Sequence, residues 1–175
     1  MNNIESERSD HATAIHELLV ASFPTDGEAG LVDDLRAAHA LPVSLVASEG
    51  SSILGYVAFS PVIIRPAGLA TVVWALAPLA IAPAAQRQGI GSALVRAGLR
   101  ACADAGCDAV VVLGAPDFYH RFGFLPAAKH SLRCSFEAPP EAFMLTELGG
   151  ASVPFHEGIV YFHSAFDRLA TPNEK

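Results

Sequence analysis

A chain of 175 residues that is 51% hydrophobic and 17% charged can fold as one globular domain around its own core. Its 11 basic and 18 acidic residues leave a formal charge of −7 without a Lys/Arg run. This balance excludes nucleic acid and anionic membranes as main partners, so an anionic ligand would need local charge or backbone dipoles.

The cysteines and the apolar stretches bear on the compartment. The three cysteines are an odd number without Cys-x-x-Cys spacing, which excludes a complete disulfide framework and a cysteine zinc cluster. Residues 1–10 are polar and acidic, unlike a secretory signal. The most apolar stretch, residues 70–85, contains Pro78 and Pro83 and is too short to span a bilayer comfortably. We therefore predict a soluble, cytoplasmic protein.

Hydrophobic periodicity predicts a mixed α/β domain with an early antiparallel meander and one strand–helix–strand crossover. In chain order we expect a strand at 4–8, a helix capped by Asp10, a helix at 27–40, strands at 44–48 and 53–63 joined as a hairpin, a strand at 71–82, a helix at 89–106, a strand at 109–113, a short helix at 116–122, and strands at 132–136, 143–148 and 159–166.

Pro78 is the unusual residue of the predicted strand at 71–82. Proline has no N–H to donate to a sheet, so it belongs at an edge, a bulge or a splay. The sequence therefore predicts a local break in the strand pairing at Pro78.

The clearest motif is a glycine turn, Gln86-Arg87-Gln88-Gly89-Ile90-Gly91-Ser92, between a buried strand and an amphipathic helix. Glycines let a ligand approach the backbone, and the free N–H groups of the first helical turn point at that ligand with the positive end of the helix dipole behind them. Arg87 adds one direct charge. The turn predicts a diphosphate site built mostly from backbone, which suits an acidic protein.

The same glycines could serve only tight packing between strand and helix, an alternative that stays open. A Walker A loop is excluded because no Gly-Lys-Ser/Thr follows. A Rossmann fingerprint fails because its third glycine position is Leu94, and because Asp108 precedes its strand instead of following it.

Two motifs together resemble a known family. Residues 86–91 look like the Gln/Arg-x-x-Gly-x-Gly/Ala pyrophosphate loop of the GNAT N-acetyltransferases. Phe118-Tyr119-His120-Arg121-Phe122-Gly123-Phe124 looks like the same family's aromatic-Tyr-x-x-x-Gly-Phe signature. The order and separation of the motifs are similar to the family's. The resemblance covers about residues 3–148, and three stretches further resemble a bacterial subgroup of predicted acetyltransferases.

The resemblance implies the GNAT acyl-CoA N-acyltransferase fold, a mixed, mostly antiparallel central sheet splayed between its fourth and fifth strands, with flanking helices. It implies acetyl-CoA as cosubstrate, with the pantetheine arm pairing with backbone groups that the splay leaves free. One of those N–H groups would polarise the thioester carbonyl. The implied cofactor-binding residues are Leu79, Ala80, Ile81, Gln86, Arg87, Gln88, Gly89, Ile90, Gly91, Ser92, Phe118 and Phe122.

Tyr119 is the residue that the resemblance implies for catalysis. A phenol within hydrogen-bond reach of the departing thiolate can protonate or stabilise it. The alternative is that Tyr119 is one more packing aromatic beside Phe118, Phe122 and Phe124. Trp74 is expected in the core, with a place in the acceptor pocket as its alternative.

A general base is not assigned. Many family members carry a carboxylate near the fourth strand, but residues 71–83 contain none. Asp26 and Glu28 are the nearest candidates, although both also fit as acidic residues at a helix N-terminus. His120 reads as an exposed helix residue, and the other histidines lack His-x-x-x-His spacing, so we predict no metal.

The predicted function is N-acetyl transfer from acetyl-CoA to a primary amine of a small molecule. The alternatives are a protein or peptide N-acetyltransferase, and a non-catalytic acyl-CoA binding or sensing module. We expect residues 1–150 to form the acetyltransferase domain and 151–175 a C-terminal extension with one extra strand. That strand either joins the same domain or pairs with a second subunit, which would give a homodimer.

Overall fold

The computed structural model describes residues 2–66, 71–150 and 152–169. Within these residues a seven-stranded sheet has the order β1-β2-β3-β5-β6-β9-β7, and a separate three-stranded sheet has the order β4-β10-β8. The strands are β1 (Asn3–Ser6), β2 (Val43–Glu49), β3 (Ser52–Pro61), β4 (Ile63–Arg65), β5 (Val73–Ile81), β6 (Ala109–Leu113), β7 (Leu125–Pro126), β8 (Leu132–Cys134), β9 (Phe143–Glu147) and β10 (Gly158–Tyr161).

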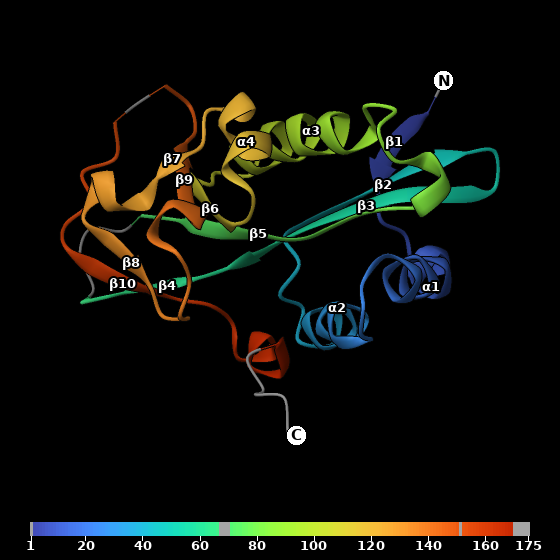
Figure 1. Cartoon of the computed structure of the whole chain (residues 1–175), viewed down its shortest axis with the longest axis horizontal. Coiled ribbons are helices and arrows are strands. Elements are labelled where there is room, and N and C mark those ends of the chain that lie inside the picture. The colour runs from blue at the N-terminus through green and yellow to red at the C-terminus, as the bar shows by residue number, and fades with distance from the viewer. Residues whose placement is uncertain (1, 67–70, 151, 170–175) are drawn as a thin grey trace.

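Helices cover both faces of the larger sheet. Helices α3 and α4 lie on one face, and α1, α2 and the 3-10 helix η6 lie on the other (Figure 1). Their bounds are α1 (Ala12–Ser22), α2 (Gly27–Ala37), α3 (Ile90–Asp104), α4 (Pro116–Tyr119) and η6 (Ser164–Leu169). Alternation along β3 explains the two cores, because Val57 and Phe59 pack with α3 while Tyr56 and Ala58 pack with α1.

The larger sheet opens between β5 and β6. The two strands run parallel and pair through Val73↔Ala109, Trp74↔Val110 and Ala75↔Val111. Beyond Ala75 the described strands pair no further, although β6 continues along β9 to Leu113↔Phe143. A bulge accompanies the divergence, because Val57 faces Leu79 while Phe59 faces Leu76. Ala77 and Pro78 of β5 thus lie opposite the single residue Ala58 of β3, so the predicted break at Pro78 is confirmed as a bulge beside a splay.

Several predicted boundaries were wrong. The strand predicted over 159–166 ends at Tyr161 and is followed by η6, and it belongs to the smaller sheet. The strand predicted over 53–63 is split into β3 and β4, and the helix predicted over 27–40 ends at Ala37. Asp10 does not cap α1, because a 3-10 turn (Ser9–His11) intervenes and the Asp10 carboxylate instead accepts a hydrogen bond from Arg8 at 3.1 Å.

Close packing of α3 on the sheet depends on Gly55 and Gly98. A Cβ at Gly55 would lie 2.8 Å from Leu94 Cδ1, and a Cβ at Gly98 would collide with the Phe59 ring. Phe59 is fully buried, so its ring has little room to move. These two glycines therefore set the height of α3, and with it the height of the glycine turn that precedes the helix.

We predict that Gly98→Ala lowers the free energy of unfolding by about 1–3 kcal/mol, because the new methyl group overpacks against Phe59. Urea denaturation measures this change. The matched control is Gly91→Ala in the same helix, where a Cβ would make ordinary contacts of 3.6 Å or more. Equal stability of the two variants would contradict this account of the packing.

Candidate active site

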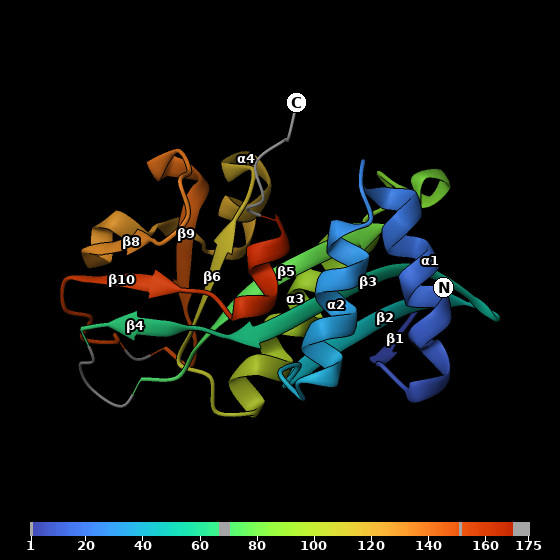
Figure 2. The ribbon, with the colours of Figure 1, turned by 90° about the horizontal axis from the view of Figure 1, so that it is seen from below.

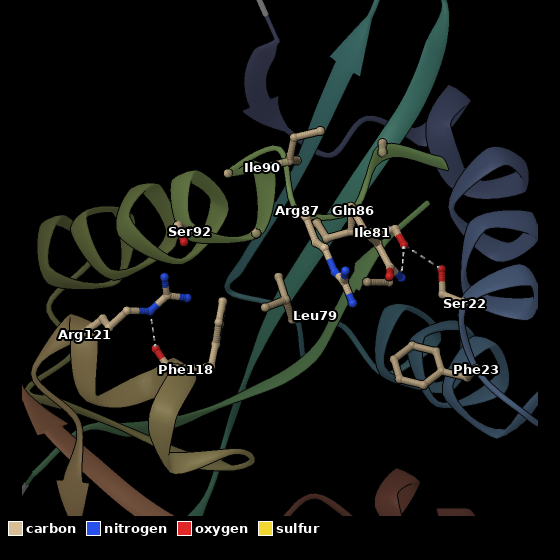
Figure 3. A pocket seen from close by; sticks show the side chains of 14 residues that line it. Ser22, Phe23, Leu79, Ile81, Gln86, Arg87, Ile90, Ser92, Phe118 and Arg121 are labelled. Atoms are coloured by element: carbon tan, nitrogen blue, oxygen red, sulfur yellow. Dashed lines mark hydrogen bonds between the residues drawn. The ribbon is translucent and has the colours of Figure 1, made fainter. Parts of the chain in front are cut away.

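A cleft of about 700 Å³ lies where the free edge of β5, the glycine turn, the end of α1 and α4 meet (Figure 3). Most residues predicted to bind the cofactor line it, namely Leu79, Ala80, Ile81, Gln86, Arg87, Gly89, Ile90, Gly91, Ser92 and Phe118. Segments far apart in the sequence thus line one cleft, beside the opening between β5 and β6.

The free edge of β5 presents the backbone of Leu79 and Ile81. The Ala82 N–H donates to the Leu54 carbonyl at 2.8 Å, so Ala82 is turned toward β3. Because the direction of backbone groups alternates along a strand, Ala80 is turned the same way and Leu79 and Ile81 the opposite way. The Ile81 carbonyl accordingly accepts hydrogen bonds from Ser22 Oγ and Gln86 Nε2, each at 3.4 Å. Leu79 lies on the same edge, facing the cleft.

The glycine turn aims helix N–H groups at the cleft. Arg87 and Gly89 have positive φ of 61° and 83°, and the Ala93 N–H donates to the Gly89 carbonyl at 3.0 Å. The N–H groups of Ile90, Gly91 and Ser92 precede that bond and have no acceptor within the described helix. Three donors and the positive end of the α3 dipole therefore face the cleft, an arrangement that favours an anion.

Packing does not explain the glycines of the turn. No described atom outside the local chain lies within 4 Å of a Cβ built at Gly89, and at Gly91 the nearest is Ile81 Cγ1 at 3.6 Å. The φ of 83° at Gly89 instead favours glycine for conformational reasons. At Gly91 the missing side chain leaves backbone accessible from the cleft, between Ile81 and Phe118.

The two glutamines of the turn stabilise it through hydrogen bonds to nearby backbone carbonyls. Gln86 Nε2 donates to the Ile81 carbonyl, and Gln88 Nε2 donates to the Ala84 carbonyl at 3.3 Å. Gln88 lies outside the cleft lining, as does Phe122, although both were predicted to bind the cofactor. Phe122 packs under the guanidinium groups of Arg96, at 5.1 Å, and Arg121, at 5.5 Å.

Arg121 is a cleft residue that the sequence motifs did not single out. Its Nε donates to the Phe118 carbonyl at 3.2 Å, and its guanidinium lies 4.7 Å from the Phe118 ring centroid. Together with Arg87 it places two cations in the lining, on either side of the cleft (Figure 3). The available signal was its place one turn after Phe118 in the aromatic motif.

Ser22, Phe23 and Ala85 also line the cleft without having been predicted. Ser22 and its partner Ile81 are 59 residues apart, so no local spacing could have joined them. The lining contains no carboxylate among the described residues, and Asp26, Glu28 and His120 all lie outside it. We therefore assign no general base among the described residues that line this cleft.

Tyr119 lies beside the cleft and not in its lining. Its ring packs directly on Gly114 at the end of β6, with the Phe118 and Phe124 centroids at 4.9 and 5.6 Å. Burial raises the pKa of the phenol to about 12. The hydroxyl is therefore protonated at neutral pH and can donate a proton or a hydrogen bond. Its catalytic role stays a prediction.

Trp74 lies away from the cleft lining, buried in the core beside Leu76 and Val110 as predicted. Within residues 2–66, 71–150 and 152–169, no three or more His, Cys, Asp or Glu side chains gather where they could hold a metal ion. No described helix is long and apolar enough to cross a membrane.

Comparison with known proteins agrees with this geometry. The family model for the acetyltransferase (GNAT) family matches residues 12–124. The uncharacterized N-acetyltransferase YhbS of Escherichia coli is 40% identical over 159 residues, which is 90% of this chain and 94% of YhbS. A second E. coli protein, the uncharacterized N-acetyltransferase YjhQ, is 34% identical over 70% of this chain and 68% of its own length.

Two solved structures resemble the whole chain. The E. coli YhbS structure in complex with CoA has a TM-score of 0.90 and 38% identity, covering 96% of this chain and 93% of that one. A GNAT acetyltransferase from Brucella melitensis in complex with acetyl-CoA has a TM-score of 0.77 and 35% identity, covering 95% and 99%. The chain belongs to the GNAT family of acetyl-CoA-dependent N-acetyltransferases, as the two sequence motifs predicted.

We predict that Gly91→Val weakens CoA binding by about ten-fold or more, because the branched side chain fills space beside the free N–H groups. Isothermal titration calorimetry with CoA measures the affinity. Gly91→Ala is the matched control, because its single methyl group makes ordinary contacts of 3.6 Å or more and should cost less affinity. Unchanged affinity in a folded Gly91→Val variant would show that this position does not face the ligand.

Proposed function

We propose that this chain transfers the acetyl group of acetyl-CoA to the primary amine of a small molecule by direct attack on the thioester. The observation that carries the proposal is the continuous path from the N-terminus of α3 to the free edge of β5. In the net reaction the N–C bond forms as the C–S bond breaks. An ammonium substrate and acetyl-CoA yield an acetamide, the free thiol of CoA and one proton released to water.

The residues present fit acetyl-CoA. The diphosphate would lie against the N–H groups of Ile90, Gly91 and Ser92, with Arg87 and Arg121 supplying charge. The extended arm would pair with Leu79 and Ile81 as an added strand, since their backbone groups face the cleft. The bound molecule supplies an acetyl thioester, which an amine can attack. The N–H of Leu79 would polarise the thioester carbonyl.

Tyr119 is proposed to stabilise the departing thiolate. Its raised pKa keeps the hydroxyl protonated, so it can donate to sulfur but does not act as a base at neutral pH. The amine proton goes to water in this scheme, because no carboxylate lines the cleft among the described residues.

The absence of a cleft carboxylate from the described lining also favours a second candidate, a non-catalytic module that binds acyl-CoA. Release of free thiol from acetyl-CoA separates the two, because a module of that kind binds acetyl-CoA without consuming it. A protein or peptide acceptor is the other alternative to a small amine. The cytoplasmic location, the homodimer and the domain boundary at residue 150 stay proposals.

We predict that Tyr119→Phe lowers kcat by about 10²–10⁴-fold while leaving acetyl-CoA affinity nearly unchanged. Only the hydroxyl is lost and the ring still packs on Gly114, so the effect falls on the transition state. Single-turnover thiol release on an accepted amine measures the chemical step. Tyr161→Phe, a matched change at an exposed position of β10, is the control. A wild-type single-turnover rate in folded Tyr119→Phe would make Tyr119 a packing residue.

A further inference from the structure

A second hollow, of about 400 Å³, lies on the α2 side of the splay. Leu76 and Ala77 of β5 and Leu113 of β6 line it. Its remaining wall comes from later segments of the chain, the β8–β9 loop and the region around η6. Figure 2 shows η6 lying against α2, and the ion pair of Arg168 with Asp34 at 2.6 Å holds the two together.

This hollow and the cofactor cleft share one strand edge. Leu76 and Ala77 line the hollow, whereas Leu79 and Ile81 line the cleft, with Pro78 between them. A ligand anchored by its diphosphate at α3 and extended from Ile81 toward Leu79 has its far end directed at Ala77. Ala77 is only two residues beyond Leu79 along the chain. The hollow is therefore where a second reactant could meet that end.

The wall of the hollow is aromatic. Phe162 lies between Phe136 and Phe166, with ring centroids 5.3 and 5.2 Å apart, so the three rings form a continuous surface. Phe166 is 4% exposed, and Leu169 at the rim is 41% exposed. A volume of this size suits a small molecule with an apolar body.

Glu137 supplies the only charge among the described residues that line the hollow. Its side chain is exposed, at the rim of an otherwise apolar lining. A single carboxylate beside an aromatic wall matches one ammonium group attached to an apolar body. Polyamines carry a second ammonium group, and aminoglycosides carry several ammonium groups on a hydroxylated body; this lining offers no further partners for those groups.

We propose that this hollow, formed by Leu76, Ala77, Leu113, the three phenylalanine rings, Leu169 and Glu137, binds the acetyl acceptor, and that the acceptor is a primary amine with an aromatic or branched apolar body whose ammonium group contacts Glu137. This inference rests on the proposed function, because it assigns the substrate class of the same reaction. The apolar body would lie against Phe136, Phe162 and Phe166, and its nitrogen would lie between Glu137 and the backbone of Ala77.

The test compares phenethylamine and isopentylamine with putrescine, kanamycin and a peptide with a polar N-terminus, using thiol release from acetyl-CoA. The expected kcat/KM for the two apolar amines exceeds that for the others by about ten-fold or more, from burial of their bodies. A preference for putrescine, kanamycin or the peptide would overturn the proposal.

Two rim variants locate the binding site. Glu137→Gln should raise KM for phenethylamine by about five-fold, the scale of an exposed ion pair. Leu169→Lys should raise this KM at least as much, because the new ammonium group repels that of the substrate. The matched controls are Glu141→Gln, on the same loop outside the lining, and Val20→Lys, at an exposed position of α1. Equal effects of rim and control variants would also overturn the proposal.

Calorimetry of phenethylamine binding to the CoA-saturated protein separates this inference from the proposed function. Binding that is weakened by Leu169→Lys but not by Val20→Lys supports the pocket even if no amine is acetylated, in which case only the proposed function fails. Acetylation confined to hydrophilic amines, with no phenethylamine binding, leaves the proposed function standing and refutes the pocket.

Discussion

The parting of β5 from β6 is the constraint on which the site depends. The strands pair over three residues and then diverge, so the outward backbone groups of Leu79 and the N–H of Ile81 have no neighbouring strand, while the Ile81 carbonyl accepts from Ser22 and Gln86. Buried backbone groups are rarely left without partners, which makes this edge a place for an extended ligand. The bulge at Ala77 and Pro78 fits this geometry, because proline cannot complete a ladder there.

A protein with a formal charge of −7 can hold a strongly anionic cosubstrate because most of the attraction comes from backbone. The first turn of α3 contributes N–H groups and a helix dipole, and Arg87 and Arg121 add two side-chain charges at the cleft. The height of this helix end is set by Gly55 and Gly98, which allow α3 to approach β3 closely. Packing and binding are thus served by different glycines, a distinction that the sequence left open.

The predictable parts of the protein are those encoded locally. The turn at residues 86–92, helix α3 and the aromatic motif can each be recognised from a short stretch of sequence. Ten of the twelve predicted cofactor residues accordingly line one cleft. Ser22, Phe23 and the smaller sheet could not be predicted in the same way, because they depend on contacts between distant segments. The end of β10 was missed for a related reason. The mostly apolar residues 159–166 fit a strand and also a strand followed by a 3-10 helix with Phe166 buried, and only packing against α2 decides between them.

Amide hydrogen exchange along β5, with and without CoA, tests the central claim most directly. If the free edge receives the ligand, CoA should slow exchange at Leu79 and Ile81, whereas Ala80 and Ala82, which face β3, should change little. Residue-resolved exchange by nuclear magnetic resonance distinguishes these alternating positions. The account would be contradicted if saturating CoA slowed exchange at Ile90, Gly91 and Ser92 but left the exchange rates of Leu79 and Ile81 unchanged. The ligand would then be bound without the open strand.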